Sequence, residues 1–387
     1  MARLGDICTV VSGSTPKTNI PEYWDGDVKW ITPAELNEDS FYLFDSQRHI
    51  SELGKEKTGL SYMPAGTVIL SSRAPIGKTA IAGCELCCNQ GFKNLICSDA
   101  IFNEYLYFFL KSKTDYLNSL GRGATFKEIS KSIVENIEIR LPSLEEQKKA
   151  AKQLGHIYHL ISLRKQQLAK LDELVKARFV ELFGDPVSNS FGWKTDYLKN
   201  VTSKIGSGAT PKGGKESYQE EGTTLIRSMN VHDGRFEYKD LAHITDEQAK
   251  QLDNVTVEEN DVFINITGAS VARSCIVPKH ILPARVNQHV AIIRCITFML
   301  NPVFANNMFL NHSFKGQLLD IGETGGATRQ AITKQQLETL EVILPPIELQ
   351  NQFAAFVEQV DKSKAAVQMS LDKLQILFDK LMQEYFK

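Results

Sequence analysis

The chain has 387 residues, of which 42% are hydrophobic and 23% are charged, and its formal net charge is −2. This length is too great for one ordinary core, and the near-neutral charge argues against non-specific binding of nucleic acid through a strongly basic surface. The apolar runs are too short to cross a membrane, and the odd number of seven cysteines indicates reduced thiols. We therefore expect a globular, cytoplasmic protein without a membrane segment.

The most informative feature is an internal repeat. SGSTPK at 12–17 recurs as SGATPK at 207–212, Asn-Gln at 89–90 recurs at 287–288, and LPSLEEQ at 141–147 recurs as LPPIELQ at 344–350. The offset between the copies grows along the chain, which places the extra residues in loops, where changes in length cost little. A repeat of this size predicts two similar domains.

Residues 1–143 are predicted to form the first mixed α and β domain. Residues 67–70 and 80–81 predict hairpin strands, and 102–110 predict a short amphipathic helix. The turn between the strands, 72–79, is one glycine short of a phosphate-binding loop. The second copy has Ala-Arg-Ser at 272–274 where the first has Gly-Lys-Thr at 77–79. We therefore favour a basic turn, not a nucleotide site.

A long helix is predicted at 144–184. Ser143 with Glu146 three residues later forms a capping box, which is a helix start. Apolar residues then recur every seven positions, which is the coiled-coil pattern. The expected seam consists of Leu154, Ile157, Ile161, Leu168, Leu171, Val175 and Leu182.

The second copy predicts a domain at 185–345 and a helix at 346–387. Hairpin strands are expected at 261–266 and 274–277, and a short helix at 303–310. The seam of the second long helix consists of Val357, Val360, Val367, Leu371, Leu374, Phe378 and Leu381. We expect the two long helices to pair antiparallel within the chain. A rod that only dimerises with other chains is the alternative.

Neither a catalytic nor a metal-binding set is recognised. Cys84, Cys87, Cys88 and Cys97 lack a second complete ligand pair, and the other copy lacks the cluster, so we expect buried thiols. Asn-Pro-Val-Phe at 301–304 resembles a methyltransferase loop but lacks its second proline. Asn301 with Pro302 is more simply a helix N-cap.

The whole chain resembles the specificity (S) subunit of a type I restriction–modification enzyme. The resemblance depends on LPSLEEQ and LPPIELQ before the long helices, Gly-Ala-Thr at 123–125 and 326–328, SGSTPK with SGATPK, and GTVILSSRAPIGK. The second copy departs from the pattern at the turn 268–272 and at Pro346. The resemblance implies an α+β protein with two tandem mixed α/β target-recognition domains. These are separated by two long helices that form an intramolecular antiparallel coiled coil.

The resemblance also implies a function. Each domain would read one half of a bipartite site on double-stranded DNA, and the coiled coil would set the spacer between the halves. The expected partners are two modification (methyltransferase) subunits and, if present, restriction subunits. S-adenosylmethionine, ATP and Mg would be bound by those partners, with no cofactor in this non-catalytic, cytoplasmic bacterial or archaeal chain. The alternatives are an enzyme with its own methyltransferase or nuclease activity, and a coiled-coil scaffold without a role on DNA.

The repeat also sorts the candidate DNA contacts, because base readers should differ between the copies while backbone contacts should recur. Arg73, aligned with Gly268, and Arg227, aligned with Thr32, are candidates for reading guanine. Basic residues shared by the copies are candidates for phosphate contacts: Lys17, Lys212, Lys78 and Arg273. Two roles are open for the amide residues shared by the copies, which are hydrogen bonding to the edge of a base and stabilisation of a turn: Asn89, Gln90, Asn287 and Gln288. Readers are expected in the dissimilar loops 18–30, 37–57 and 213–256.

Overall fold

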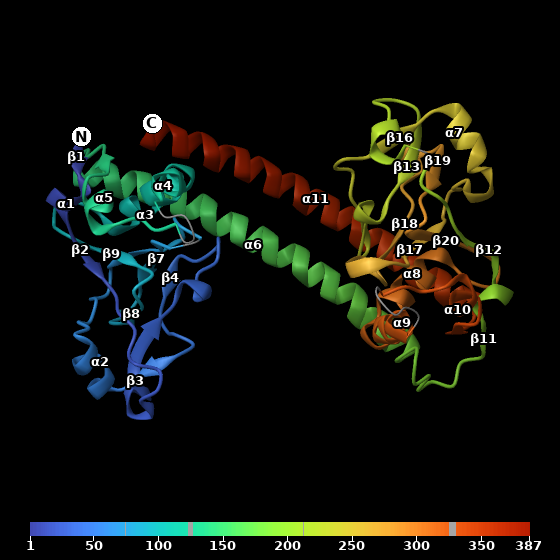
Figure 1. Ribbon diagram of the computed structural model, residues 1–387, viewed down its shortest axis with the longest axis horizontal. Coiled ribbons are helices and arrows are strands. Elements are labelled where there is room, and N and C mark those ends of the chain that lie inside the picture. The colour runs from blue at the N-terminus through green and yellow to red at the C-terminus, as the bar shows by residue number, and fades with distance from the viewer. Residues whose placement is uncertain (74, 123–126, 212, 325–329) are drawn as a thin grey trace. The chain divides into compact units, whose positions relative to one another are not determined.

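The computed structural model describes residues 1–73, 75–122, 127–211, 213–324 and 330–387 (Figure 1). The chain divides into two compact units. The first unit comprises Met1–Gln166 and Val367–Lys387, and the second unit comprises Gln167–Ala366. Each unit therefore holds one mixed α and β domain together with part of each long helix.

Two sheets form the body of the first unit. The larger has the strand order β2-β9-β6-β7-β4, and the smaller has the order β5-β3-β8. β6 and β7 pair antiparallel with Ile69 opposite Ala80, which confirms the predicted hairpin. The strands are β2 (Cys8–Ser12), β3 (Trp24–Ile31), β4 (Tyr42–Leu43), β5 (His49–Ile50), β6 (Val68–Leu70), β7 (Thr79–Ala82), β8 (Cys87–Cys88) and β9 (Lys93–Cys97).

Short helices cover the larger sheet of the first unit. The predicted helix at 102–110 is confirmed as α3 (Asn103–Ser112), in which every residue from Tyr105 to Leu110 is buried. This burial explains its apolar sequence, because such a helix is covered on most of its faces. The other elements are β1 (Ala2–Arg3), α1 (Leu4–Ile7), α2 (Glu52–Thr58), α4 (Thr114–Leu120), α5 (Lys131–Glu135) and β10 (Glu138–Ile139), which pairs with β1.

The second unit repeats this plan with different peripheral strands. Its sheets have the orders β12-β20-β17-β18 and β16-β13-β19, with the pairs β14-β15 and β11-β21. The predicted hairpin is confirmed as β17 and β18, with Phe263 opposite Cys275. The strands are β11 (Thr195–Tyr197), β12 (Thr202–Ser207), β13 (Thr223–Ile226), β14 (Val231–His232), β15 (Arg235–Phe236), β16 (Ala242–Ile244), β17 (Val262–Asn265), β18 (Ser274–Ile276), β19 (Ala284–Val286), β20 (Val290–Cys295) and β21 (Glu341–Ile343).

Four short α-helices accompany the described sheets of the second unit: α7 (Asp246–Gln251), α8 (Pro302–Leu310), α9 (His312–Thr324) and α10 (Lys334–Glu338). Asn301 is the N-cap of α8, since its side-chain oxygen accepts hydrogen bonds from the backbone of Val303 (2.8 Å) and Phe304 (3.3 Å). The capping interpretation of Asn-Pro-Val-Phe is therefore confirmed, and the predicted helix at 303–310 is α8.

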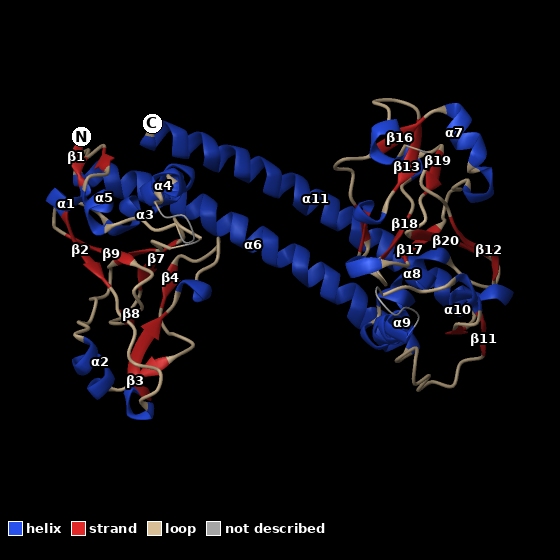
Figure 2. Cartoon of the chain, in the orientation of Figure 1, coloured by secondary structure: helices blue, strands red, loops and turns tan. Residues whose placement is uncertain are grey.

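Two helices of 40 residues, α6 (Leu144–Phe183) and α11 (Ile347–Phe386), pass through both units (Figure 2). Ser143 and Glu146 form the predicted capping box at the start of α6, with Ser143 N donating to Glu146 Oε2 (3.0 Å). In the first unit Tyr158 of α6 lies 5.8 Å from Phe378 of α11, measured between ring centroids. In the second unit Asp172 pairs with Lys364 (2.7 Å). The early part of each helix thus meets the late part of the other, which is the predicted antiparallel pairing.

The seam residues proposed from the sequence are all buried or half-buried in the structure. The helices also bury aromatic residues that a seven-residue repeat does not predict, because these side chains pack against the domains. Phe179 and Phe353, for example, enter the core of the second unit, with ring centroids 5.5 Å apart. Within the described residues, no helix combines the length and apolarity needed to span a membrane.

Candidate nucleic-acid interface

A glycine loop follows the first strand of the main sheet in both units. A Cβ atom added to Gly13 would lie 2.1 Å from the carbonyl oxygen of Asn89, and one added to Gly208 would lie 1.7 Å from that of Val286. These distances leave no room for a side chain. The repeated glycine is therefore required by the close approach of the loop to the strand end that carries the Asn-Gln pair.

The asparagine of each Asn-Gln pair holds a turn. Asn89 Oδ1 accepts a hydrogen bond from Gly91 N (2.9 Å), and Asn287 Oδ1 accepts one from His289 N (3.0 Å). The structure thus shows the turn-stabilising contact for the two asparagines, while pairing with a base edge stays a prediction. The same contact in both copies explains why the asparagine recurs.

The glutamine of each pair is exposed and is oriented by a threonine of the glycine loop. The Thr15 hydroxyl donates to Gln90 Oε1, and the Thr210 hydroxyl donates to Gln288 Oε1. A glutamine whose oxygen is occupied in this way presents its NH₂ group as a donor to solvent or to a ligand. Both units therefore hold a similar polar group at the same place on the sheet.

The second unit extends this arrangement through a histidine. Gln288 Nε2 lies 3.2 Å from His289 Nε2, and His289 Nδ1 contacts the hydroxyl of Thr267. A His289 tautomer protonated on Nδ1 satisfies both contacts. The first unit has Gly91 at this place, so the histidine distinguishes the two copies.

In the first unit the corresponding surface carries a charge cluster. Arg73 Nε donates to Glu128 Oε2 (2.9 Å), while Lys93 Nζ contacts Glu128 Oε1 (3.3 Å) and Ser72 Oγ (3.4 Å). Burial opposes ionisation of Glu128, but the hydrogen bonds from Arg73 and Lys93 outweigh it and lower the pKa of the carboxyl group. The Lys93 side chain is only 8% exposed, whereas that of Arg73 is 45% exposed. Lys93 is thus held inside the cluster, whereas the guanidinium group of Arg73 stays accessible to a ligand.

The backbone shows which residues of the second unit occupy equivalent places. Arg73 forms an isolated β-bridge with Glu128, and its counterpart is the bridge between Thr267 and Ala331. Arg73 therefore corresponds to Thr267, and the alignment of Arg73 with Gly268 was wrong by one residue. The reason is that the turn of the second unit is one residue longer.

The same comparison places Lys93 opposite Ser12 in β2 and Ala291 opposite Ser207 in β12. The strand positions are equivalent, but the lysine is replaced by alanine. The three charged residues of the first unit thus correspond to three neutral ones: Thr267, Ala291 and Ala331.

The basic residues shared by the copies make internal contacts. Lys78 Nζ donates to the carbonyl oxygen of Leu36 (2.6 Å), and Arg273 Nη1 lies 3.5 Å from His232 Nδ1. Lys17 is exposed, and its carbonyl oxygen accepts a hydrogen bond from Trp24 Nε1 (3.2 Å). Phosphate contacts by these residues stay a prediction. Lys212 and the Gly-Ala-Thr segments at 123–125 and 326–328 lie outside the described residues.

Arg227 has an unsatisfied donor. Its guanidinium carbon lies 5.4 Å from the ring of Tyr218, and one terminal nitrogen donates to the carbonyl oxygen of Asp240. The Nε atom is buried without a hydrogen-bond partner in the described part of the chain. A buried donor left unpaired costs about 1–3 kcal/mol.

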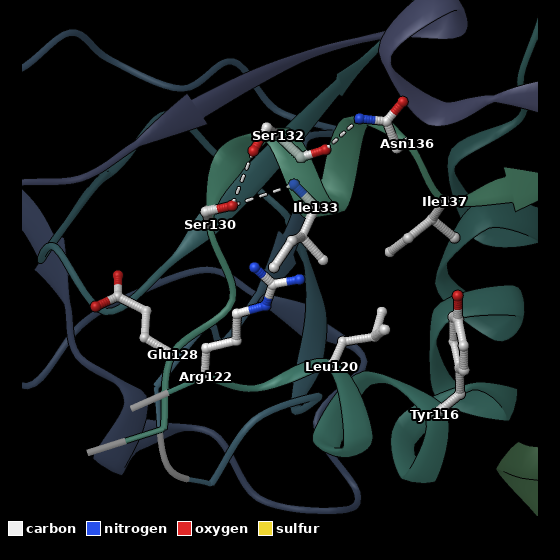
Figure 3. A pocket seen from close by; sticks show the side chains of 9 residues that line it. All are labelled: Tyr116, Leu120, Arg122, Glu128, Ser130, Ser132, Ile133, Asn136 and Ile137. Atoms are coloured by element: carbon white, nitrogen blue, oxygen red, sulfur yellow. Dashed lines mark hydrogen bonds between the residues drawn. The ribbon is translucent and has the colours of Figure 1, made fainter. Parts of the chain in front are cut away.

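A surface hollow of about 530 Å³ lies in the first unit and has Glu128 of the charge cluster in its lining (Figure 3). Ser130 Oγ accepts a hydrogen bond from Ile133 N (3.2 Å) and contacts Ser132 Oγ (3.0 Å), so these two serines of the lining stabilise the start of α5. The hollow is lined by Tyr116, Leu120, Arg122, Glu128, Ser130, Ser132, Ile133, Asn136 and Ile137. Three or more His, Cys, Asp or Glu side chains grouped to hold a metal ion are not found among the described residues.

Comparison with known proteins identifies the family. The model of the type I restriction modification DNA specificity domain matches residues 1–173 and 192–374. The chain belongs to the type I restriction–modification specificity-subunit family. The type I restriction enzyme MjaIX specificity subunit of Methanocaldococcus jannaschii is 31% identical over 378 residues, which cover 92% of this chain and 85% of the relative. The MjaVIII specificity subunit of the same organism is 21% identical over 376 residues, covering 93% and 85%.

Solved structures of this family share the fold. The S subunit of a type I restriction–modification system from M. genitalium superposes with a TM-score of 0.61 at 14% identity, covering 100% of this chain and 95% of the other. A chain from a type I R-M system gives a TM-score of 0.56 at 19% identity, covering 99% and 96%. The predicted family and the predicted fold of tandem mixed domains with two long helices are thus confirmed.

Sequence reasoning missed several residues of this surface. Thr15 and Thr210 were visible as parts of a repeated motif, but their contact with the glutamines was not. Lys93 and Glu128 were not singled out, because their ion pair joins distant segments of the chain. A signal was present nonetheless: both are charged in the first copy and alanine in the second, which is the pattern expected of residues specific to one domain.

Proposed function

We propose that this chain selects the DNA target of a type I restriction–modification enzyme, with each domain reading one half of a bipartite site. One observation supports this most directly. The two domains share the glycine loop and the threonine–glutamine pair, while the groups beside that pair differ. A shared frame with different neighbours suits two related surfaces that bind the same polymer but different base sequences.

In the first domain Arg73 is the reader that we propose. Its guanidinium group is half-exposed and is held by Glu128, and a planar fork of this kind matches the O6 and N7 acceptors of guanine. In the second domain the equivalent Thr267 contacts His289. Arg227, which is half-buried and stands where the first domain has Thr32, is the reader that we propose for the second half-site.

The glutamine pair serves both half-sites in this proposal. Gln90 and Gln288 present the same donor from the same place, so they contact a feature common to both halves, such as a phosphate oxygen or a shared base edge. Lys17, Lys78 and Arg273 are proposed as further phosphate contacts.

We further propose that the chain has no catalytic activity of its own and acts in the cytoplasm with partner subunits. Two modification subunits would bind S-adenosylmethionine, and restriction subunits, where present, would use ATP and Mg. The coiled coil would set the spacer between the half-sites. Deleting one heptad from both α6 and α11 tests this, and an unchanged spacer would contradict it.

The decisive experiment is methylome sequencing of cells with and without this chain, in the presence of its modification subunits. We expect a split motif that appears only with the chain. The alternative that the chain is itself an enzyme is tested by adding labelled S-adenosylmethionine and DNA to the purified chain alone. Methyl transfer without partners would overturn the proposal of a non-catalytic subunit. Filter binding with and without the modification subunits tests the scaffold alternative, which predicts no retained DNA in either case.

A further inference from the structure

Two cysteines of the first unit face each other across neighbouring strands. Cys8 is the first residue of β2, Cys97 is the last residue of β9, and the two are direct partners in the antiparallel register. The structure has both as free thiols. Cys8 is buried at 8% exposure, whereas Cys97 is half-buried and therefore open to small reagents.

The hydrogen-bond pattern shows that this is the close type of strand pair. Ser98 N donates to the carbonyl oxygen of Ile7 (3.0 Å), which makes those two residues a hydrogen-bonded pair. The next pair along an antiparallel ladder is non-hydrogen-bonded, with Cα atoms about 4.5 Å apart. This separation lies inside the range of about 4.4–6.8 Å that a disulfide requires, so Cys8 and Cys97 need no large backbone movement to join.

The two thiols affect each other's ionisation. Hydrogen bonding with Cys97, together with burial, raises the pKa of Cys8, and the same coupling lowers the pKa of Cys97. The thiolate is the reactive form of cysteine. Cys97 is thus both the more accessible and the more acidic thiol of the pair, and Cys8 is held beside it.

We propose that Cys8 and Cys97 are an oxidisable pair that forms a disulfide with small-molecule disulfides such as oxidised glutathione. The Cys97 thiolate attacks one sulfur of oxidised glutathione, forming a mixed disulfide and releasing one glutathione thiolate. The Cys8 thiol, losing its proton, then attacks the Cys97 sulfur and expels the second glutathione as its thiol. The protein loses two hydrogen atoms in total, and one oxidised glutathione becomes two reduced molecules.

The second unit provides a built-in comparison. Ile296 N donates to the carbonyl oxygen of Val201 (2.9 Å), and the neighbouring pair is Thr202 opposite Cys295, where the ladder has a bulge directly after Thr202. Threonine stands there in place of the second thiol. Oxidation would therefore link strands in the first domain alone.

The test is peptide mapping of the full chain after incubation with oxidised glutathione under native conditions. After the incubation the remaining free thiols are alkylated, the chain is digested, and the peptides are analysed without reduction. We expect a linked peptide that contains Cys8 and Cys97 and is lighter by two hydrogen atoms, with Cys295 alkylated. Cys8→Ser should leave Cys97 as the mixed disulfide with glutathione.

Two results would overturn the proposal. One is a folded chain in which Cys8 and Cys97 are both recovered as alkylated, and therefore unoxidised, residues while other cysteines have been oxidised. The other is a Cys8→Ser variant that folds but in which Cys97 forms no mixed disulfide with glutathione, because Cys97 would then not be the attacking thiol. Calorimetry gives an independent readout: the link should raise the unfolding temperature of the first domain by several degrees and leave the second domain unchanged.

Discussion

Gln147 and Gln350 make the same three hydrogen bonds at the starts of the two long helices. Gln147 accepts from Phe102 N (2.8 Å) and donates to the carbonyl oxygens of Ala100 (3.1 Å) and Pro142 (2.9 Å). Gln350 accepts from Asn301 N (2.9 Å) and donates to the carbonyl oxygens of Met299 (3.2 Å) and Pro345 (2.8 Å). Both side chains are fully buried. Each glutamine therefore fixes its helix to the loop before the helix α3 or α8.

Replacing Gln147 with leucine should destabilise the first unit by about 2–4 kcal/mol. The substitution keeps the approximate volume but leaves buried backbone groups without partners, and each such group costs about 1–3 kcal/mol. Denaturant unfolding measures the effect. Gln350→Leu is the matched control and should destabilise the second unit instead. Equal stability of Gln147→Leu and the unchanged chain would contradict this role.

Arg73→Ala should alter one half of the recognised DNA site and leave the other half unchanged. Loss of a true base contact costs about 1–3 kcal/mol and relaxes one position of the site. Methylome sequencing with the variant chain measures this directly. Arg227→Ala is the counterpart, expected to relax the other half. If neither variant changed the methylated motif, both arginines would be excluded as base readers.

Thr15→Val should weaken DNA binding without changing the sequence that is read. Valine keeps the shape of threonine but cannot donate to Gln90, so the amide loses its orientation. The loss should be about 1 kcal/mol, or roughly fivefold in affinity. Thr210→Val should act to the same extent in the second domain. Titration of the assembled methyltransferase with its DNA site gives the affinities, and a relaxed motif would instead assign these residues to base reading.

The charge cluster predicts a pH dependence of the first domain. The pKa of Glu128 is lowered from 4.5 in the folded state, so its stabilising contribution is present above that value. The contribution is lost as the pH falls through the lowered pKa. Glu128→Gln should therefore narrow the stability difference between neutral and acidic pH. Denaturant unfolding of the unchanged chain and of Glu128→Gln at neutral and acidic pH tests this. Parallel pH profiles of the free energy of unfolding would show that Glu128 contributes nothing to the pH dependence.

The sequence carried enough information for the architecture, because the repeat, the helix caps and the seven-residue pattern are local signals. The capping box at Ser143 and the N-cap at Asn301 are examples. It carried less about the surface. Arg73 could be aligned only by counting residues, and a longer turn in the second copy shifted its partner from Gly268 to Thr267.

The remaining contacts depend on segments far apart in the chain. Thr15 meets Gln90, and Lys93 meets Glu128, only after the strands have paired. Neither helix nor strand periodicity encodes such a meeting. The repeat helped because a residue pair that recurs, or is replaced as a set, is visible before its contact is known.

The antiparallel pairing of the long helices has a consequence for synthesis. Phe378, Met382 and Phe386 of α11 belong to the core of the first unit, where Phe386 lies 5.0 Å from Tyr105. A ribosome adds these residues only after it has made the whole of the second unit. Domains usually fold in the order of their synthesis. Here the domain that emerges first can complete its interior only after the later one has emerged.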